Sequence, residues 1–531
     1  MRKAPPVLHF DFSNITMPNR QRDDLFQLVK SLEKGEKRNF KLYMQRNTGN
    51  AELKVVQLFD ALDKMEEYDE GQLLRKNKAI AKSQLSNLKA SLYRHVLASL
   101  RLLKDENNIV LTLNELMDQA RILYNKGLYL QSLKVLEKIK QIARQYHQLT
   151  YLQQALFFEK KIEAMYITRS MEHRADELTE ESTQVHQLLE QVNSLSNLSL
   201  QLYAWYIKHG HARNANDRKA VKEYFETHLP PAARQSKAFY SRLYLYQSQC
   251  WLSFILHDYL TYYKNAIRWV DLFRKQPDMI VVETIHYIKG MHNLLGAHYD
   301  LKNAAPFFQS LAEFEAFYES DLVQDNNNYR IQTFVYLYTS KLHQHFMEGT
   351  FTEGLLLVPE IETNLREMSL YLDRHRILVF YYKIACLFFG AGLNEAAIDY
   401  LNRIIHQKID LRIDVQCYAR LLHLIAHYAI GSHDLIPYLV KNVYRFMAKM
   451  QNLSIVEEEM FRFLRNSFHL SAREVRPHLQ SLLDKLKKFE NNAGEARAFA
   501  YLDVISWLES KIAGVPVEQV IRQKFLAGRK G

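Results

Sequence analysis

The sequence is short of the two residues that most often break or turn a chain. It has 16 glycines and 11 prolines among 531 residues, about half of the usual share of these residue types. Sheets and hairpins need them at their tight turns, so a mainly β protein is excluded. Residues that favour helices, such as Leu, Gln, Lys and Glu, are abundant. We therefore expect an all-α fold of helices joined by short connections.

Cysteines, long apolar runs and a signal peptide are scarce or missing as well. The three cysteines lie far apart, at Cys250, Cys386 and Cys417. An odd, widely spaced set excludes a disulfide-stapled secreted domain and indicates a reducing compartment. The longest apolar run, residues 377–393, contains Lys383 and two glycines, which favours a buried helix over a membrane span. Asp11 interrupts any apolar leader. We expect a cytoplasmic protein without a membrane partner.

Catalytic motifs are missing from the chain. It has no phosphate-binding P-loop and no G-x-S-x-G nucleophile motif. Gly390 and Gly392 begin a G-x-G, but Glu395 occupies the third glycine position. His423 and His427 have the spacing of a metal-binding pair on a helix, yet no Glu follows His423 as in zinc proteases. We therefore expect a protein that is not an enzyme and that has no cofactor, metal or catalytic residue.

What the chain does have is a repeated pattern. A helical stretch ends at a turn residue, a small residue follows five positions later, and a large apolar residue comes four positions after that. The pattern occurs at Gly127, Ser132, Leu136; at Gly349, Gly354, Val358; and at Gly392, Ala397, Leu401. Turns are expected near Gly127, Ser170, Gly210, His257, Lys302, Gly349, Gly392 and Gly431. Because one helix pair cannot bury its apolar side alone, successive pairs should stack.

These positions resemble tetratricopeptide repeats. The best copy matches at Tyr381, Ala385, Phe388, Gly392, Ala397 and Leu401; others match at Ala120, Gly127, Ser132, Leu136 and at Tyr338, Gly349, Gly354, Val358. The period is longer than the 34 residues of that family, the best copy lacks the closing proline, and Ile436 takes the small position after Gly431. Residues 32–40 also resemble the start of bacterial proteins of this repeat type that have no assigned function.

The resemblance implies a right-handed superhelix whose groove binds a protein or peptide. The first helix of each pair would line that groove; tyrosines on these helices are Tyr338, Tyr381, Tyr382 and Tyr418. We expect an extended arm over residues 1–19, a basic helical domain over 20–108, a tetratricopeptide-like solenoid over 111–450 and capping helices over 451–531. Within the last segment, residues 517–525 form an amphipathic piece suited to cover the final apolar face.

Capping-box spacing predicts three helix starts. The pairs are Thr350 and Glu353, Ser454 and Glu457, and Ser471 and Glu474. Gly514 followed by Pro516 predicts that a helix stops there and another begins.

The positive charge is concentrated near the N-terminus. The formal net charge is +11, and residues 1–104 hold 20 Lys and Arg against 12 Asp and Glu. Residues 71–104 contain eight basic residues and no acid. A leucine stripe should dock this helix through Leu85, Leu88, Leu92, Val96, Leu100 and Leu103. A basic face should lie beside the stripe, formed by Lys82, Lys89, Arg94, Arg101 and Lys104.

Three interpretations of the basic face stay open. It can be a solvated helix surface, it can meet an acidic protein or the acidic cluster Glu66, Glu67, Asp69 and Glu70, or it can bind phosphates of a nucleic acid. We expect a non-enzymatic scaffold that binds a protein or peptide through its groove. The alternative is a regulator that binds nucleic acid through the basic N-terminal helices. The sequence does not determine the identity of the partner or the oligomeric state.

Overall fold

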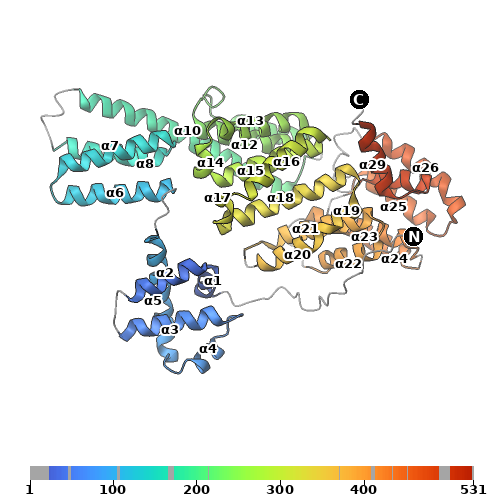
Figure 1. Cartoon of the computed structure of the whole chain (residues 1–531). Coiled ribbons are helices and arrows are strands. Elements are labelled where there is room, and N and C mark those ends of the chain that lie inside the picture. Colours follow the sequence, from blue (N-terminus) through green and yellow to red (C-terminus); the bar gives the residue numbers. More distant parts are fainter. Residues whose placement is uncertain are drawn as a thin grey trace. The chain divides into compact units, whose positions relative to one another are not determined.

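The chain is built from helices throughout the part that the structure describes. The computed structural model describes residues 23–45, 50–103, 108–165, 173–212, 214–369, 371–407, 413–432, 434–450, 453–489 and 503–528. Every regular element in these ranges is a helix (Figure 1), which confirms the all-α prediction. The arm expected at residues 1–19, the turn at Ser170 and the side chain of Lys104 lie outside the described residues. The chain divides between Glu106 and Asn107 into two compact units.

The first unit is a small bundle around one long helix. Its helices are α1 (Asp24–Ser31), α2 (Lys34–Gln45), α3 (Asn50–Lys64), α4 (Glu70–Lys76) and α5 (Lys82–Arg101). Helices α1, α2 and α3 all contact α5. The core includes Val29, Phe40 and Phe59, which are fully buried, and the Phe40 and Phe59 rings lie 4.5 Å apart.

The leucine stripe located the longest helix of this unit correctly. Leu85, Leu92 and Val96 of the stripe are buried on α5, whereas Leu103, which was expected to dock with them, is exposed beyond the end of the helix. Helices α2 and α4 were not predicted, because neither has an apolar stripe long enough to be recognised: α2 buries only Phe40 and Met44, and α4 buries only Leu73.

The second unit begins with helices that each pack on the next. They are α6 (Ile109–Asn125), α7 (Tyr129–Gln145), α8 (Leu149–Glu163), α10 (Arg174–His209), α11 (Ala215–His228), α12 (Phe239–Ile255), α13 (Tyr259–Lys275), α14 (Asp278–Val282), α15 (Thr284–Asp300) and α16 (Ala304–Tyr318). Neighbours in sequence are neighbours in space for most of these helices. Pro230 and Pro231 fall in the connection between α11 and α12, as expected of residues that break helices.

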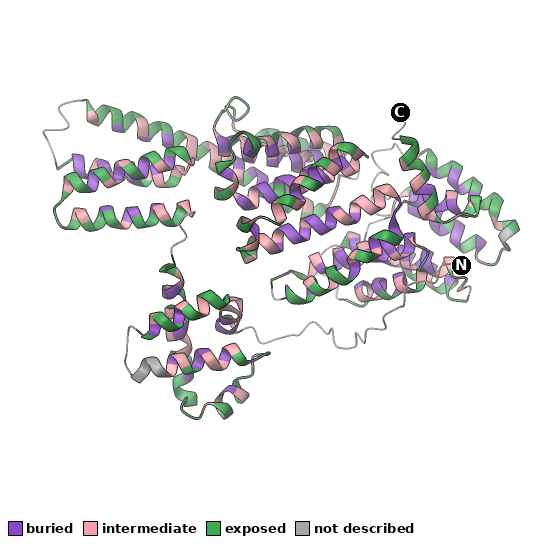
Figure 2. Ribbon diagram, in the orientation of Figure 1, coloured by how far each residue is buried: buried purple, intermediate pink, exposed green. Residues whose placement is uncertain are grey.

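The same order of packing continues to the C-terminal end. The remaining helices are α17 (Asp321–Gln324), α18 (Asn327–Glu348), α19 (Phe351–Gly354), the 3₁₀ turn η1 (Leu355–Leu357), α20 (Val358–Glu367), α21 (Arg374–Gly390), α22 (Asn394–Ile405), α23 (Ile413–Ala429), α24 (Ile436–Lys449), α25 (Ile455–Ser467), α26 (Ala472–Lys487), α28 (Val504–Ala513) and α29 (Val517–Gly528). Their buried residues lie on the sides that face neighbouring helices (Figure 2). Sequential packing of this kind is consistent with a helical repeat.

The expected turn residues adopt the left-handed backbone conformation. Positive φ angles occur at Gly127 (74°), Gly210 (71°), His257 (56°), Lys302 (54°), Gly349 (66°), Gly392 (81°) and Gly431 (76°). His147, at 55°, makes an additional corner that was not predicted. At most of these corners the next amide donates to the carbonyl five residues before it, at 2.8–3.1 Å; the donors include Leu128, Asp258, Asn303, Thr350, Leu393 and Ser432. One hydrogen-bonded corner therefore recurs along the unit.

Small residues of the repeated pattern lie where helices cross. Ser132 is fully buried on α7, and its hydroxyl donates to the Ala120 carbonyl of α6 at 2.8 Å. A Cβ added to Gly354 would lie 2.9 Å from side-chain atoms of both His345 and Leu387. Ala397 of α22 has no exposed surface. A larger side chain at these positions would push packed helices apart.

Two of the three predicted capping boxes are present. Those at Ser454 and Ser471 have both reciprocal hydrogen bonds. The prediction at Thr350 is wrong, because the Thr350 side chain makes no cap and instead lies 2.8 Å from the Nδ1 atom of His345. The helix stop at Gly514 and the restart at Val517 are confirmed.

The last two helices return to the middle of the unit. Five consecutive residues of α28, Val504 to Leu508, are buried. Glu518 of α29 accepts hydrogen bonds from the Thr352 amide and hydroxyl at 2.9 and 2.7 Å. A Cβ on Gly349 would lie 2.5 Å from the Arg522 nitrogen, so only glycine permits this approach. The amphipathic piece at residues 517–525 thus packs on α18 as well as α28.

Among the described residues, each helix is either too short or too polar to cross a bilayer.

The recurring corner yields a reciprocal stability test. Lys302 and Gly392 both occupy exposed left-handed corners, and left-handed backbone costs about 1 kcal/mol or more for residues with a Cβ. We expect Lys302→Gly to raise the free energy of unfolding by about 0.5–1 kcal/mol and Gly392→Lys to lower it by about 1 kcal/mol. Chemical denaturation measures both. Equal stability of the two variants and the parent would contradict this account of the corners.

Candidate binding face

Three helices, α15, α18 and α21, lie next to one another in the second unit. Helix α15 contacts α18, and α18 contacts α21. Each carries two polar side chains seven residues apart: His292 and Tyr299 on α15, Tyr336 and His343 on α18, and Arg376 and Lys383 on α21. Seven residues make about two helical turns, so both members of each pair lie on the same side of their helix.

The six side chains form two ladders that cross the three helices. In the first ladder, the His292 and Tyr336 rings stack 4.2 Å apart, and the Arg376 guanidinium lies 5.9 Å from the Tyr336 ring centre. In the second, the Tyr299 and His343 rings stack 4.1 Å apart.

A hydrogen bond completes the second ladder. Lys383 Nζ lies 2.6 Å from His343 Nε2. Each ladder thus runs from an aromatic ring on α15, through a second ring on α18, to a cation on α21. All six side chains are partly exposed, so a ligand can reach them.

Neighbouring cations and burial keep the two histidines of the ladders neutral. An ammonium group can only donate, so His343 Nε2 accepts from Lys383 and its proton lies on Nδ1. Burial, and then the charge of Lys383, hold the pKa of His343 well below its ordinary value. Burial, followed by the charges of Lys383 and Arg376, lowers the pKa of His292 to about 4.

Further polar groups extend the face along α15. Lys289, one turn before His292, is exposed and adds a further basic side chain to the face. Asp300 follows Tyr299, and burial raises the pKa of its carboxyl to about 7 although the charge of Lys383 opposes this. Burial also raises the pKa of the Cys386 thiol to about 12, so Cys386 is not an activated nucleophile. The face offers hydrogen-bond donors and positive charge rather than a nucleophile and its base.

Of the four groove tyrosines noted in the sequence, three lie in the core. Tyr338, Tyr382 and Tyr418 are buried, while Tyr381 is partly exposed, with Arg403 near its ring. Sequence analysis missed Tyr299 and Tyr336. The seven-residue spacing of polar aromatic and basic residues was the available signal, but it becomes meaningful only when three such helices are aligned.

The predicted basic residues of the first unit do not all lie together. Lys82, Arg94 and Arg101 are exposed on α5. The Lys89 ammonium contacts Asp23 at 2.7 Å and Glu70 at 3.9 Å and donates to the Tyr68 hydroxyl.

The surroundings of Lys89 favour its charged form. Burial by itself disfavours the ammonium, but the hydrogen bonds to Asp23 and Tyr68 and the charge of Asp23 outweigh it and raise the pKa of Lys89. Lys89 therefore links α5 to Asp23, which precedes α1, and to Tyr68, which precedes α4. Glu70 belongs to the acidic cluster of residues 66–70. The contact between Lys89 and Glu70 therefore agrees with the interpretation that the basic face meets this cluster.

The two histidines that the sequence spaces as a possible metal-binding pair lie together on one helix. The rings of His423 and His427 lie 4.5 Å apart on α23, and His427 contacts the Ser432 hydroxyl at 3.2 Å. Within the ranges described, no three His, Cys, Asp or Glu side chains are placed to hold a metal ion.

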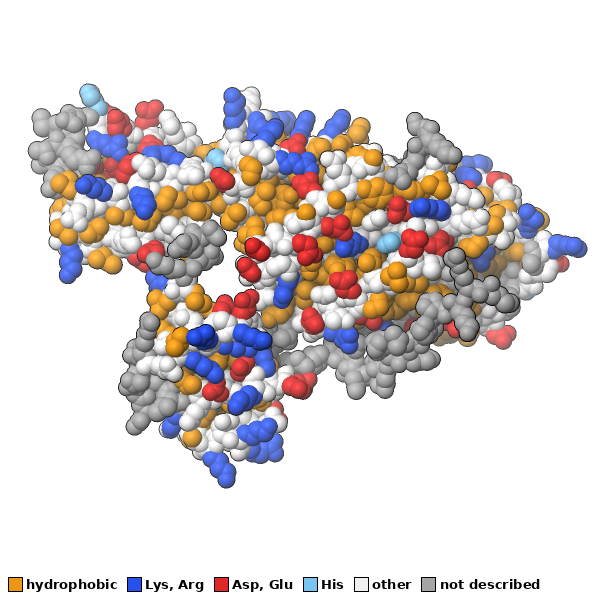
Figure 3. Space-filling view, in the orientation of Figure 1, with side chains coloured by type: hydrophobic (Ala, Val, Ile, Leu, Met, Phe, Trp, Pro, Cys, Tyr) orange, Lys and Arg blue, Asp and Glu red, His pale blue; other side chains and the backbone are white. Residues whose placement is uncertain are grey.

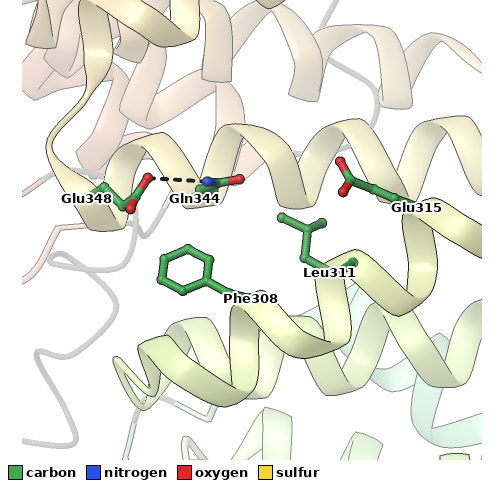
Figure 4. Close-up of a pocket in the computed structure, with 6 residues that line it drawn as sticks. Phe308, Leu311, Glu315, Gln344 and Glu348 are labelled. Carbon is green, nitrogen blue, oxygen red and sulfur yellow. Dashed lines mark hydrogen bonds between the residues drawn. The ribbon is translucent and has the colours of Figure 1, made fainter.

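A shallow hollow of about 330 Å³ lies between α16 and α18 (Figure 4). Phe308 and Leu311 line its apolar wall. Its acidic groups are already engaged: Glu348 accepts from Gln344 at 3.2 Å, and Glu315 pairs with Lys341 at 3.1 Å. The hollow therefore presents no charged group that lacks a partner.

The proposed function rests on these residues alone, because no protein-family model and no curated protein matches the chain.

The neutral state of His343 makes the second ladder sensitive to acid. Unfolded histidine binds a proton near pH 6.5, whereas His343 in the fold resists it. Stability present above pH 6.5 is therefore lost as the pH falls. We expect His343→Gln, which can still accept from Lys383, to lose up to about 2 kcal/mol less stability than the parent between pH 7 and pH 5.

Unfolding at both pH values measures this difference. The matched control is His478→Gln at an exposed position of α26, which should follow the parent. An identical loss in the parent and His343→Gln would contradict the assigned role of His343.

Proposed function

We propose that the second unit is a tetratricopeptide-like solenoid, wound as a right-handed superhelix, that acts as a non-enzymatic scaffold and holds a partner polypeptide across the two ladders. The sequential packing of helix pairs and the recurring corner support the architecture. The observation that carries the function is the alignment of two ring–ring–cation ladders on three adjacent helices.

The chemistry of the ladders suits a polypeptide. Seven residues on α21 separate Arg376 and Lys383 by about 10 Å, the span of about three residues of an extended chain. Both cations can donate to backbone carbonyls or side-chain carboxylates of such a chain. The flat rings of Tyr336 and Tyr299 offer contact area for its side chains at low cost in side-chain entropy.

Binding to nucleic acid through the first unit is a second proposal with less support. It rests on the absence of acidic residues from residues 71–104 and on the exposure of Lys82, Arg94 and Arg101. The involvement of Lys89 in internal contacts leaves fewer cations for phosphates. Failure of the full chain to be retained on DNA at about 50 mM salt, where phosphate contacts are strongest, would exclude it.

The scaffold proposal is tested by a charge change on the binding face. Lys289 and Arg376 are accessible from solvent, so we expect Lys289→Glu combined with Arg376→Glu to fold. The double variant should capture at least about tenfold less of the natural partner from native lysate than the parent, because close charged pairs contribute one or more kcal/mol to binding.

The matched control carries the same charge change on the second helix of a pair. Lys264→Glu combined with Arg268→Glu alters two exposed residues of α13 and should capture the partner as the parent does. Equal capture by all three proteins, or no reproducible partner after stringent washing, would contradict binding at the ladders.

A further inference from the structure

One side of helix α5 is exposed to solvent and is not part of the core of the first unit. Leu85, Leu92 and Val96 bury the other side in the core. The exposed residues follow helical spacing and form what we name the outer strip: Lys82, Ser86, Ala90, Tyr93, Arg94, Leu97 and Arg101. The strip runs nearly the whole length of α5, about 29 Å at 1.5 Å per residue.

The middle of the outer strip is apolar although it faces water. The exposed fractions of Tyr93 and Leu97 are 40% and 44%. These residues are four apart, so their side chains are neighbours on the helix surface. Ala90 and Ser86, about one and two turns before Tyr93, are small enough for another backbone to approach α5 closely. Tyrosine and arginine are also the residue types enriched at protein interfaces.

The charge of the outer strip has a single sign. Residues 71–104 contain no acid, so α5 provides no counter-charge of its own. Lys82 and Arg94 make no ion pair with any residue of the described ranges. Lys and Arg side chains are numerous on the visible face of this unit (Figure 3). A partner surface that covers the strip must therefore supply carboxylates.

We propose that the outer strip docks an acidic amphipathic helix of another protein. Its apolar residues would contact Tyr93 and Leu97, and its carboxylates would pair with Lys82 and Arg94. A helix suits this site because the exposed residues of the strip recur every three or four positions along one side of α5. The side chains on one face of a partner helix have the same spacing. This interaction is independent of the ladders on the second unit.

The charge of the strip disfavours two other occupants. A second copy that used the same strip would bring like cations together, which costs free energy. Nucleic acid that paired with Arg94 would leave the apolar side chains of Tyr93 and Leu97, in the middle of the strip, without apolar contacts. The carboxylates of Asp23 and Glu70, which contact Lys89, would also repel phosphates at its edge.

The test measures binding of three labelled probes to the full chain by fluorescence anisotropy. The first is a peptide of Glu, Ala and Leu, about five helical turns long, with its leucines in one stripe. The second has the same composition with the leucines dispersed, and the third is a DNA duplex. We expect the striped peptide to bind more tightly than the other two.

Two substitutions separate the apolar from the charged contribution. Leu97→Ser and Arg94→Glu should each weaken binding of the striped peptide about tenfold. Lys78→Glu, at an exposed position outside α5, makes the same charge change as Arg94→Glu and should alter binding less than about twofold. All three positions are exposed, and thermal unfolding checks that each variant keeps the stability of the parent.

Three results would overturn the proposal. Equal binding of the two peptides would show attraction by charge alone. DNA binding that is tighter than peptide binding and unaffected by Leu97→Ser would identify a phosphate-binding surface. No binding of the striped peptide would leave the strip as an ordinary solvated helix face.

Discussion

The left-handed residue at the end of helix after helix is the constraint on which the second unit depends. At most such corners the chain turns back, and the next amide satisfies a carbonyl that the helix end would leave unpaired. The same corner recurs at Gly127, His257, Lys302, Gly349 and Gly392. Between such corners, most helices that follow one another in sequence pack on one another, which is consistent with a helical repeat.

The candidate binding face is a consequence of this regularity. First helices that follow one another side by side bring residues of α15, α18 and α21 into contact although they are about 40 residues apart in sequence. Stacked rings fix His292 and His343 in position, and low exposure keeps both neutral beside Arg376 and Lys383. The cations are thus held on a rigid support, which reduces the entropy lost when a ligand binds.

The first unit follows a different physical logic. Its helix α5 is the centre of a small bundle and carries both the core and the surface on which binding is proposed. Lys89 lies between these two sides of α5. Its ammonium group pairs with Asp23 and donates a hydrogen bond to the Tyr68 hydroxyl. Lys82 and Arg94, by contrast, are exposed to solvent and point away from the core.

Local patterns in the amino-acid sequence predicted the helical class, most of the corners and the buried side of helices such as α5. These depend on local properties: the low glycine and proline content, the small residue five positions after a turn, and the spacing of residues such as Leu92 and Val96. Even His257 and Lys302, which lack the freedom of glycine, were located by the period of the pattern. Thr350 was misassigned because a histidine one turn before it, His345, competes for its hydroxyl.

Which polar residues act together depends on how the helices pack against one another. Helical period places Tyr336 and Tyr338 on the same helix but cannot say that the first faces a ladder and the second the core. It also cannot separate Lys89 from Arg94, since the carboxylate that holds Lys89 lies 66 residues away. Contacts between distant segments depend on how whole helices pack, and that packing is a sum over many side chains that no local pattern records.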